Sequence, residues 1–222
     1  MEKTQLKRHD MVFLTKAGKN CLLEELLPRY HGIKRDMVEE ILAGPADIPG
    51  FVRRDEQQLD KIAIGFVHHA KLEDNRLRVA AYVSEEWIRQ VLRPYDAIRK
   101  PVSPRSYCIE AALFLQRYAA QCGLQVGVLG SAALEMVTGI TYTDRKSDLD
   151  LLVRPAPLEK LEALYKSASE HYPSVPFDFE VELPNGFGVK LTELFMNTGT
   201  VLGKSLTQVD LLNKKDVLSF LN

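Results

Sequence analysis

Apolar and polar residues alternate in two neighbouring stretches in the first half of the chain. The stretches "KIAIGFV" (61–67) and "RLRVAAYV" (76–83) are separated by a polar turn that contains Asp74 and Asn75. Apolar residues occupy every second position from Leu77 to Val83, which is typical of a strand with one buried face. We therefore predict two paired strands here.

The rest of the first half of the chain contains weaker signals of strands and of helices. "RHDMVFL" (8–14) reads as a short strand, and "KRDMVEEILAG" (34–44) as an amphipathic helix that ends at Gly44. "SEEWIRQVL" (84–92) begins with Ser84 followed by two acids, which predicts a capped helix. The expected fold of this part is a small α+β domain.

A break follows at "RPYDAIRKPVSP" (93–104), where three prolines interrupt regular structure. We place the domain boundary there, with an N-terminal domain over 1–95 and a second domain over 96–222. Ser103 and Gly123 delimit a predicted helix whose first residue is Pro104. The later segments alternate between strand and helix and end in a hairpin around Pro-Asn-Gly (184–186), predicting an α+β domain with a mixed sheet packed with helices.

The composition and charge of the chain exclude some classes of function. The chain is 45% hydrophobic and 27% charged, with a net charge of −1, as in an ordinary globular protein. It lacks the broad positive field that drives non-specific nucleic-acid binding, so we expect no nucleic-acid partner. We find no apolar signal core and no run long enough to cross a membrane, which predicts a cytoplasmic protein without a membrane partner.

Two carboxylates interrupt the apolar stretch "SDLDLLV" (147–153). Residues two apart on a strand point to the same face, so Asp148 and Asp150 project together. Like charges repel unless a proton or a cation joins them, and oxygen ligands of this kind suit Mg²⁺ or Mn²⁺. A third acid is expected from "FDFEVEL" (177–183), where Asp178, Glu180 and Glu182 share one face.

Residues suited to phosphate binding flank these acids. Gly130 allows close approach of a ligand to the backbone, and Ser131 adds a hydroxyl at the start of a predicted helix. Three basic residues are further candidates for a polyphosphate: Arg145, Lys146 and Lys204. Each feature alone is commonplace in a surface turn, but the combination favours a site for a metal and a nucleotide.

The order Gly-Ser, helix, Asp-x-Asp and third acid resembles the nucleotidyltransferase superfamily that shares the DNA polymerase β-like core. "RHDMVFL", "GFVRR", "GITYTDRKSDLDLLV" and "VELPNGFGVKLTEL" followed by "VLGKS" are similar to the phosphoribosyl-dephospho-CoA transferase family of malonate decarboxylase, also called its holo-acyl-carrier-protein synthase. The similarity extends over nearly the whole chain. Only the Gly-Ser and Asp-x-Asp block is sharply specific.

The resemblance implies a defined reaction and site. The donor would be 2′-(5″-triphosphoribosyl)-3′-dephospho-CoA, the acceptor a serine of the malonate decarboxylase acyl carrier protein, and the leaving group pyrophosphate. Asp148 and Asp150 would be the catalytic metal-binding pair, and Gly130 and Ser131 the phosphate-contacting turn. For the third metal-binding acid we favour Asp178, with Glu180 on the same face as the alternative. The first domain would bind the CoA-like tail or dock the carrier protein.

One segment departs from the family pattern. Where a glycine- and arginine-rich stretch is expected, the chain has "IGFVHHAKLEDNRL" (64–77), and we expect His68 and His69 to lie in a surface turn. Two other functions remain open. One is a nucleotidyltransferase that uses ATP with a small molecule or protein as acceptor, and the other is a binding module that keeps the fold without catalysis.

Overall fold

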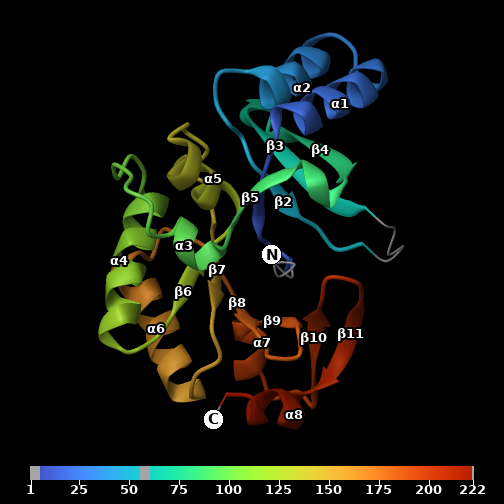
Figure 1. Cartoon of the computed structure of the whole chain (residues 1–222). Coiled ribbons are helices and arrows are strands. Elements are labelled where there is room, and N and C mark those ends of the chain that lie inside the picture. Colours follow the sequence, from blue (N-terminus) through green and yellow to red (C-terminus); the bar gives the residue numbers. More distant parts are fainter. Residues whose placement is uncertain (1–5, 56–60, 222) are drawn as a thin grey trace. The chain divides into compact units, whose positions relative to one another are not determined.

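The computed structural model describes residues 6–55 and 61–221 (Figure 1). The chain divides into two compact units, Met1–Arg93 and Pro94–Asn222. Each unit has its own sheet and its own helices. The predicted α+β fold class, with a mixed sheet packed with helices in the second part, is confirmed, and the structure shows a separate antiparallel sheet in the first part.

The first unit contains an antiparallel sheet with strand order β4-β3-β2-β1-β5. Its strands are β1 (Met11–Leu14), β2 (Gly50–Val52), β3 (Ile62–Leu72), β4 (Asn75–Val83) and β5 (Ile88–Leu92). Its helices are α1 (Lys16–Leu26) and α2 (Ile33–Ala43), with short 3₁₀ turns at Leu27–Arg29 and Glu85–Trp87. The predicted hairpin is present as β3 and β4, whose buried side chains include Val79, Ala81 and Val83.

The helix predicted over 84–92 is wrong. Ser84 makes no capping hydrogen bond, and after one 3₁₀ turn the chain becomes β5, which pairs with the fully buried β1. The backbone N–H and C=O groups of a buried strand need partners, and β5 supplies them along one edge of β1. The Trp87 carbonyl also accepts a hydrogen bond of 2.8 Å from the Thr15 N–H. Tertiary pairing has overridden local helix propensity.

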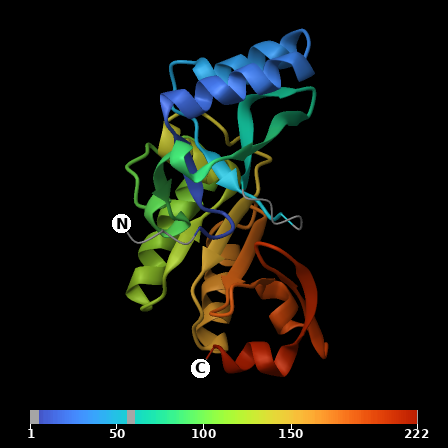
Figure 2. The ribbon, with the colours of Figure 1, turned by 45° about the vertical axis from the view of Figure 1, so that its right-hand side comes forward.

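The second unit contains a mixed sheet with strand order β11-β10-β9-β8-β7-β6. Its strands are β6 (Val126–Val128), β7 (Leu149–Val153), β8 (Phe177–Glu182), β9 (Gly188–Lys190), β10 (Thr200–Lys204) and β11 (Val209–Asn213). Its helices are α3 (Pro94–Ala97), α4 (Tyr107–Gln121), α5 (Gly130–Thr138), α6 (Leu158–His171), α7 (Leu191–Phe195) and α8 (Lys214–Ser219). Figure 2 shows the β10–β11 hairpin, in red, at one edge of this sheet.

The pairing directions bring several strand ends to one edge of the sheet. β7 and β8 run parallel, while β6 and β9 run antiparallel to their neighbours β7 and β8. The C-terminal end of β6 therefore meets the N-terminal ends of β7 and β8. We call this meeting point the acidic edge, defined by Gly130, Asp148, Asp150 and Asp178.

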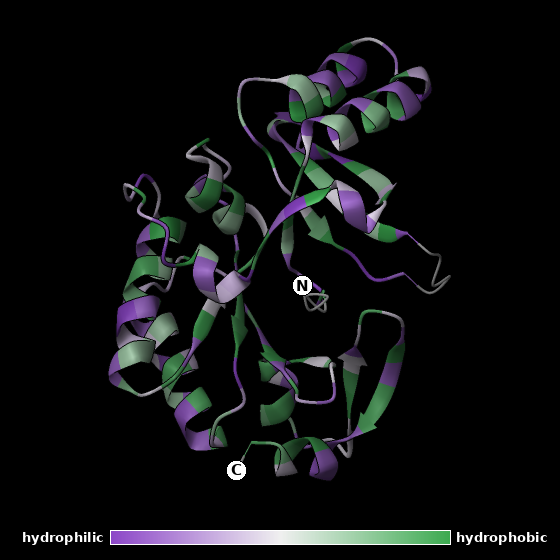
Figure 3. Ribbon diagram, in the orientation of Figure 1, coloured by the Kyte–Doolittle hydropathy of each residue, from purple (hydrophilic) through white to green (hydrophobic). Residues whose placement is uncertain are grey.

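Helices α4 and α6 pack against each other and against the sheet through its apolar face. Tyr165 of α6 meets Phe179 of β8 edge to face, with ring centroids 5.8 Å apart. Hydrophobic and hydrophilic residues intersperse along both helices in Figure 3, as expected for helices with one buried side. Among the described residues, no helix combines the length and the apolar character that crossing a membrane requires.

The start of α4 differs from the sequence prediction. Ser106 caps this helix by accepting a hydrogen bond of 3.3 Å from the Ile109 N–H, so the predicted cap at Ser103 was three residues too early. The Ser106 hydroxyl also lies 2.6 Å from the Thr143 hydroxyl, which comes from the loop before β7. This contact from a distant segment helps to fix where α4 begins.

Candidate active site

The turn at Gly130 and the strand carrying Asp150 are in direct contact. The Leu129 N–H donates a hydrogen bond of 2.9 Å to the Asp150 carbonyl oxygen, joining the end of β6 to the start of β7. Gly130 has φ +57°, and a Cβ at this position would overlap with the Asp150 Oδ2 atom. Only glycine satisfies both conditions without strain, because it has no Cβ and tolerates positive φ.

Asp150 and Asp178 face each other across the parallel strands. Asp150 pairs in register with Asp178, and directly opposite residues in a sheet share a face. Asp148 lies one residue before β7 and is exposed, whereas Asp150 is half-buried. The structure thus brings the predicted pair and the favoured third acid to one edge.

Glu180 lies farther from Asp150 than Asp178 does. It pairs with Leu152, two residues along the strand, which corresponds to about 7 Å at the rise of a β-strand. Glu180 shares the face of Asp178 and is directly opposite Lys190 on β9. Register therefore favours Asp178 over Glu180 as the partner of Asp150.

Ser131 occupies the first turn of α5, next to Gly130. The helix has Leu129 as its N-cap, whose side chain makes no capping hydrogen bond, and the first N–H groups of a helix have no partner within the helix. Such N–H groups together with a serine hydroxyl can bind a phosphate oxygen. This arrangement is compatible with the predicted role of Gly130 and Ser131.

The predicted basic residues lie in different places. Arg145 and Lys146 are exposed in the turn before Asp148, where the Lys146 N–H donates to Asp144 Oδ1 at 2.8 Å. Lys204 pairs with Gly188, which is opposite Glu182. That position is four residues along the sheet from Asp178, or about 13 Å, so the structure does not bring Lys204 to the acidic edge.

Lys190 is a basic residue at the acidic edge that the sequence analysis did not select. Its Nζ atom lies 2.7 Å from Asp178 Oδ2, and both side chains are almost half exposed. The hydrogen bond that Lys190 donates to Asp178, together with the charges of Asp178 and Asp150, raises the pKa of Lys190. Lys190 follows Asp178 by 12 residues across the β8–β9 hairpin, and this spacing is the sequence signal that could have identified Lys190.

Glu135 of α5 organises the loop that leads to the acids. It is 1% exposed, and its Oε2 atom accepts hydrogen bonds from the Tyr142 N–H (2.9 Å), the Thr143 N–H (2.7 Å) and the Thr143 hydroxyl (2.8 Å). The Thr143 hydroxyl donates to Glu135, so it accepts from Ser106. Glu135 thereby ties the helix after Gly130, the loop before Asp148 and the start of α4 together.

Cys108 of α4 supports Asp148 from the buried side. Its thiol lies 3.3 Å from the Asp148 carbonyl oxygen. Burial raises the pKa of the Cys108 thiol to about 12, with further contributions from the negative charges of Asp148 and Glu135. The thiol therefore stays protonated at neutral pH and donates to the carbonyl.

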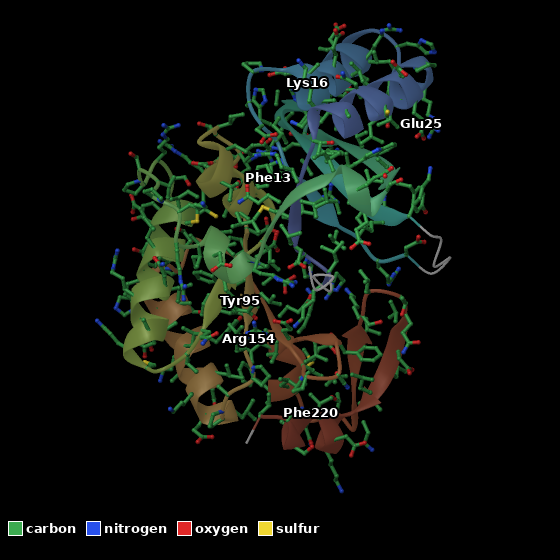
Figure 4. All side chains as sticks on the ribbon, in the orientation of Figure 1. Phe13, Lys16, Glu25, Tyr95, Arg154 and Phe220 are labelled. Atoms are coloured by element: carbon green, nitrogen blue, oxygen red, sulfur yellow. The ribbon has the colours of Figure 1, made fainter. Side chains whose placement is uncertain are left out.

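A second charged cluster lies farther along the same face of the sheet. Tyr95 donates a hydrogen bond of 2.8 Å to Glu182 Oε2, and Arg154 pairs with the same oxygen at 2.9 Å. The Arg154 guanidinium lies 4.3 Å from the centre of the Tyr95 ring, and both residues are labelled in Figure 4. Burial, followed by the charge of Glu182, raises the pKa of Tyr95 well above its usual range. Glu182 is therefore held by a cation and a hydroxyl.

The donor set at the acidic edge suits a hard divalent cation. Asp148, Asp150 and Asp178 all lie at this edge, although in the described part of the chain their carboxylate oxygens do not form a group within 4.8 Å of one another, and such oxygen ligands are those of Mg²⁺ and Mn²⁺ rather than of softer metals. Asp148 and Asp150 remain accessible to solvent, and Asp178 is paired with a lysine whose side chain is almost half exposed. The residues present fit the predicted Mg²⁺ or Mn²⁺.

His68 and His69 are not in a surface turn, so that prediction is wrong. Both lie in β3, beside an irregularity in its pairing with β4, and His68 is 3% exposed. His68 Nε2 lies 3.0 Å from Glu40 Oε2, and His69 Nδ1 lies 3.8 Å from Glu40 Oε1. The three side chains form a possible ligand cluster.

The hydrogen bonding of His68 favours a structural role for this cluster. Its Nδ1 atom accepts the Ala70 N–H at 3.1 Å, so the neutral ring carries its proton on Nε2. That N–H then donates to Glu40 and ties β3 to α2. A metal at Nε2 would require a proton on Nδ1, opposite the Ala70 N–H.

Comparisons with known proteins place the chain among group-transferring enzymes. A family model described as the phosphoribosyl-dephospho-CoA transferase MdcG C-terminal domain matches residues 98–215. A phosphoribosyl-dephospho-CoA transferase of Azotobacter vinelandii is 31% identical over 182 residues, covering 72% of this chain and 82% of the relative. One of Pseudomonas fluorescens is 29% identical over 191 residues, covering 76% and 86%. No solved structure gives a significant match.

The chain belongs to the MdcG family of phosphoribosyl-dephospho-CoA transferases. The matched residues 98–215 contain all four residues of the acidic edge as well as Lys190. The family and the enzyme class predicted from the sequence are confirmed.

Proposed function

We propose that this transferase moves the phosphoribosyl-dephospho-CoA unit from 2′-(5″-triphosphoribosyl)-3′-dephospho-CoA to a serine of the malonate decarboxylase acyl carrier protein. Family membership supports the transferred group. The observation that carries the chemistry is the register pairing of Asp150 with Asp178 beside the Gly130 turn. An edge with acids beside a helix N-terminus suits a substrate that carries a triphosphate.

The reaction exchanges one phosphate ester bond for another. The serine oxygen forms a bond to the α-phosphorus of the donor, the bond from that phosphorus to the bridging oxygen of pyrophosphate breaks, and pyrophosphate leaves. The serine proton passes to a carboxylate of the acidic edge.

Asp148, Asp150 and Asp178 would hold Mg²⁺ or Mn²⁺. Such an ion, when bound, neutralises charge on the phosphates and favours ionisation of the attacking hydroxyl. The protein's own part is to present the carboxylates at the beginnings of two neighbouring strands, β7 and β8. Glu180, two residues farther along β8, is the alternative third ligand.

Other parts of the chain have supporting roles in this proposal. Gly130, Ser131 and the first N–H groups of α5 contact the phosphates. Arg145 and Lys146, exposed in the turn before Asp148, attract the polyphosphate. The first unit binds the CoA-like tail or docks the carrier protein.

The test uses purified carrier protein, Mg²⁺ and the triphosphoribosyl donor. The wild-type protein should add the mass of the phosphoribosyl-dephospho-CoA group to the carrier and release pyrophosphate, and the double variant Asp148→Ala/Asp150→Ala should do neither. Circular dichroism should show that the variant is folded. Glu162→Gln, which changes an exposed acid of α6, is the matched control and should retain transfer.

Three results would reject the proposal. Near-normal transfer by a folded double variant would exclude the acidic edge as the reaction centre. Labelling of the carrier by labelled ATP, but not by the triphosphoribosyl donor, would instead identify an ATP-dependent nucleotidyltransferase. Binding of the donor with no metal-dependent pyrophosphate release would indicate a module that binds without catalysis.

A further inference from the structure

The position of Lys190 is set by backbone pairing and not by its side chain. Lys190 ends β9 opposite Glu180 and immediately precedes α7, for which it is the N-cap residue. From there its side chain reaches diagonally to Asp178, where Nζ and Oδ2 are 2.7 Å apart. The backbone is therefore anchored in the sheet, and only the side chain needs to move for Lys190 to change its partner.

The ammonium group of Lys190 offsets the repulsion between two neighbouring carboxylates. Asp150 and Asp178 are opposite each other, and two neighbouring carboxylates repel when both are ionised. Lys190 supplies a positive charge to this pair. Because the side chains of Lys190 and Asp178 are 46% and 42% exposed, their ion pair is weak and exchangeable.

We propose that Lys190 exchanges its partner during the reaction: it neutralises Asp178 before the donor binds, and it contacts the triphosphate oxygens of the bound donor. This inference rests on the proposed function. Release of Asp178 makes that carboxylate available to a divalent cation, while the ammonium group gains a multiply charged partner. Lys190 thus serves as a binding residue for the polyphosphate.

The alternatives among the basic residues are less well placed. Lys204 pairs with Gly188, about 13 Å along the sheet from Asp178, and Arg154 is held by Glu182. Lys190 has a flexible four-carbon stem and binds phosphate as a point charge, so it can follow the donor without a change in the sheet.

The first measurement is the binding of Mn²⁺ alone to the full-length protein by isothermal titration calorimetry. Lys190→Met should bind Mn²⁺ roughly two- to fivefold more tightly than the wild type, since the ammonium no longer competes for Asp178. Asp150→Ala should lose most of this binding. Lys166→Met is the matched control, because Lys166 also forms an exposed ion pair, with Glu170 at 3.9 Å, but on α6.

The second measurement is the binding of inorganic tripolyphosphate in the presence of Mg²⁺. Lys190→Met should bind it roughly tenfold more weakly, the loss expected for one charge-assisted hydrogen bond. Lys190→Arg keeps the charge and should stay close to the wild type. Tighter Mn²⁺ binding combined with weaker tripolyphosphate binding is a pair of opposite changes that unfolding of a variant does not produce, and thermal melting checks the fold directly.

Two outcomes would overturn the inference, and they are distinguishable from failure of the proposed function. If Lys190→Met leaves both affinities unchanged while Asp150→Ala loses Mn²⁺, Lys190 is only a structural partner of Asp178 and the proposed function stands. If tripolyphosphate binding is unchanged and only Mn²⁺ binds more tightly, the contact with the donor is rejected. If Asp150→Ala binds Mn²⁺ like the wild type, the metal site of the proposed function fails, and the tripolyphosphate result still decides the role of Lys190.

Discussion

Asp150 and Asp178 lie directly opposite each other on the parallel strands β7 and β8, although 27 residues separate them in the chain. The pairing places both carboxylates on one face, and β6 brings Gly130 against Asp150 from the other side. The acidic edge is therefore a product of sheet topology. Its parts come from three strands that are joined by helices.

The register predicts which acid completes the site. Asp178→Asn should lower transfer by about two orders of magnitude or more, because it removes a charge aligned with Asp150. Glu180→Gln should cost less, since Glu180 is offset by two residues along the strand. Initial rates at saturating donor, together with Mn²⁺ affinity, would check the order, and a larger loss for Glu180→Gln would reverse the assignment.

Because Gly130 contacts Asp150, we predict that a methyl group added at Gly130 lowers both the stability of the protein and its transfer activity. Gly130→Ala should destabilise the protein by about 1–2 kcal/mol from positive φ alone, and it should also displace the Asp150 carboxylate. Gly123→Ala is the matched control: its φ is +70°, and nothing lies within 4 Å of an added Cβ. Urea unfolding should show a loss of stability for both variants, while transfer should fall only for Gly130→Ala.

Glu135 should act through the loop that it holds. Glu135→Ala leaves buried donors of Tyr142 and Thr143 without their acceptor and should cost about 3 kcal/mol of unfolding free energy. Glu135→Gln keeps a carbonyl oxygen at this position and should cost clearly less. Chemical denaturation measures both variants, and equal losses would show that the negative charge of the carboxylate matters more than the shape of the side chain or the presence of a carbonyl acceptor.

The raised pKa of Cys108 predicts that the protein loses stability at alkaline pH. In the unfolded chain a thiol ionises near pH 8.5, whereas the pKa of folded Cys108 is raised to about 12. Between these values the folded state binds more protons than the unfolded state, so the unfolding free energy falls as pH rises. Cys108→Ala should show a shallower decline from pH 8 to pH 10, and a variant of the exposed Cys21 should not. Identical slopes for Cys108→Ala and the wild type would contradict the assignment.

Local patterns were sufficient for much of the fold. The β3–β4 hairpin, α2, the helix after Gly130 and the β8–β9 hairpin all follow from periodicity and turn residues close in sequence. Predictions failed where a distant segment determines local structure. The pairing of β5 with β1 overrides the helix signal after Ser84, and the contact between Ser106 and Thr143 accompanies a later start of α4 than Ser103 predicts.

The sequence by itself determined the family and the residue types of the site, because Gly-Ser, Asp-x-Asp and a later acidic strand are read from neighbouring positions. Only the tertiary structure decided which of these residues meet. Register aligns Asp178 with Asp150, brings Lys190 to Asp178 and leaves Lys204 four residues farther along the sheet. The physical reason is that hydrogen bonds between strands set the register, and those bonds join backbone groups far apart in the chain.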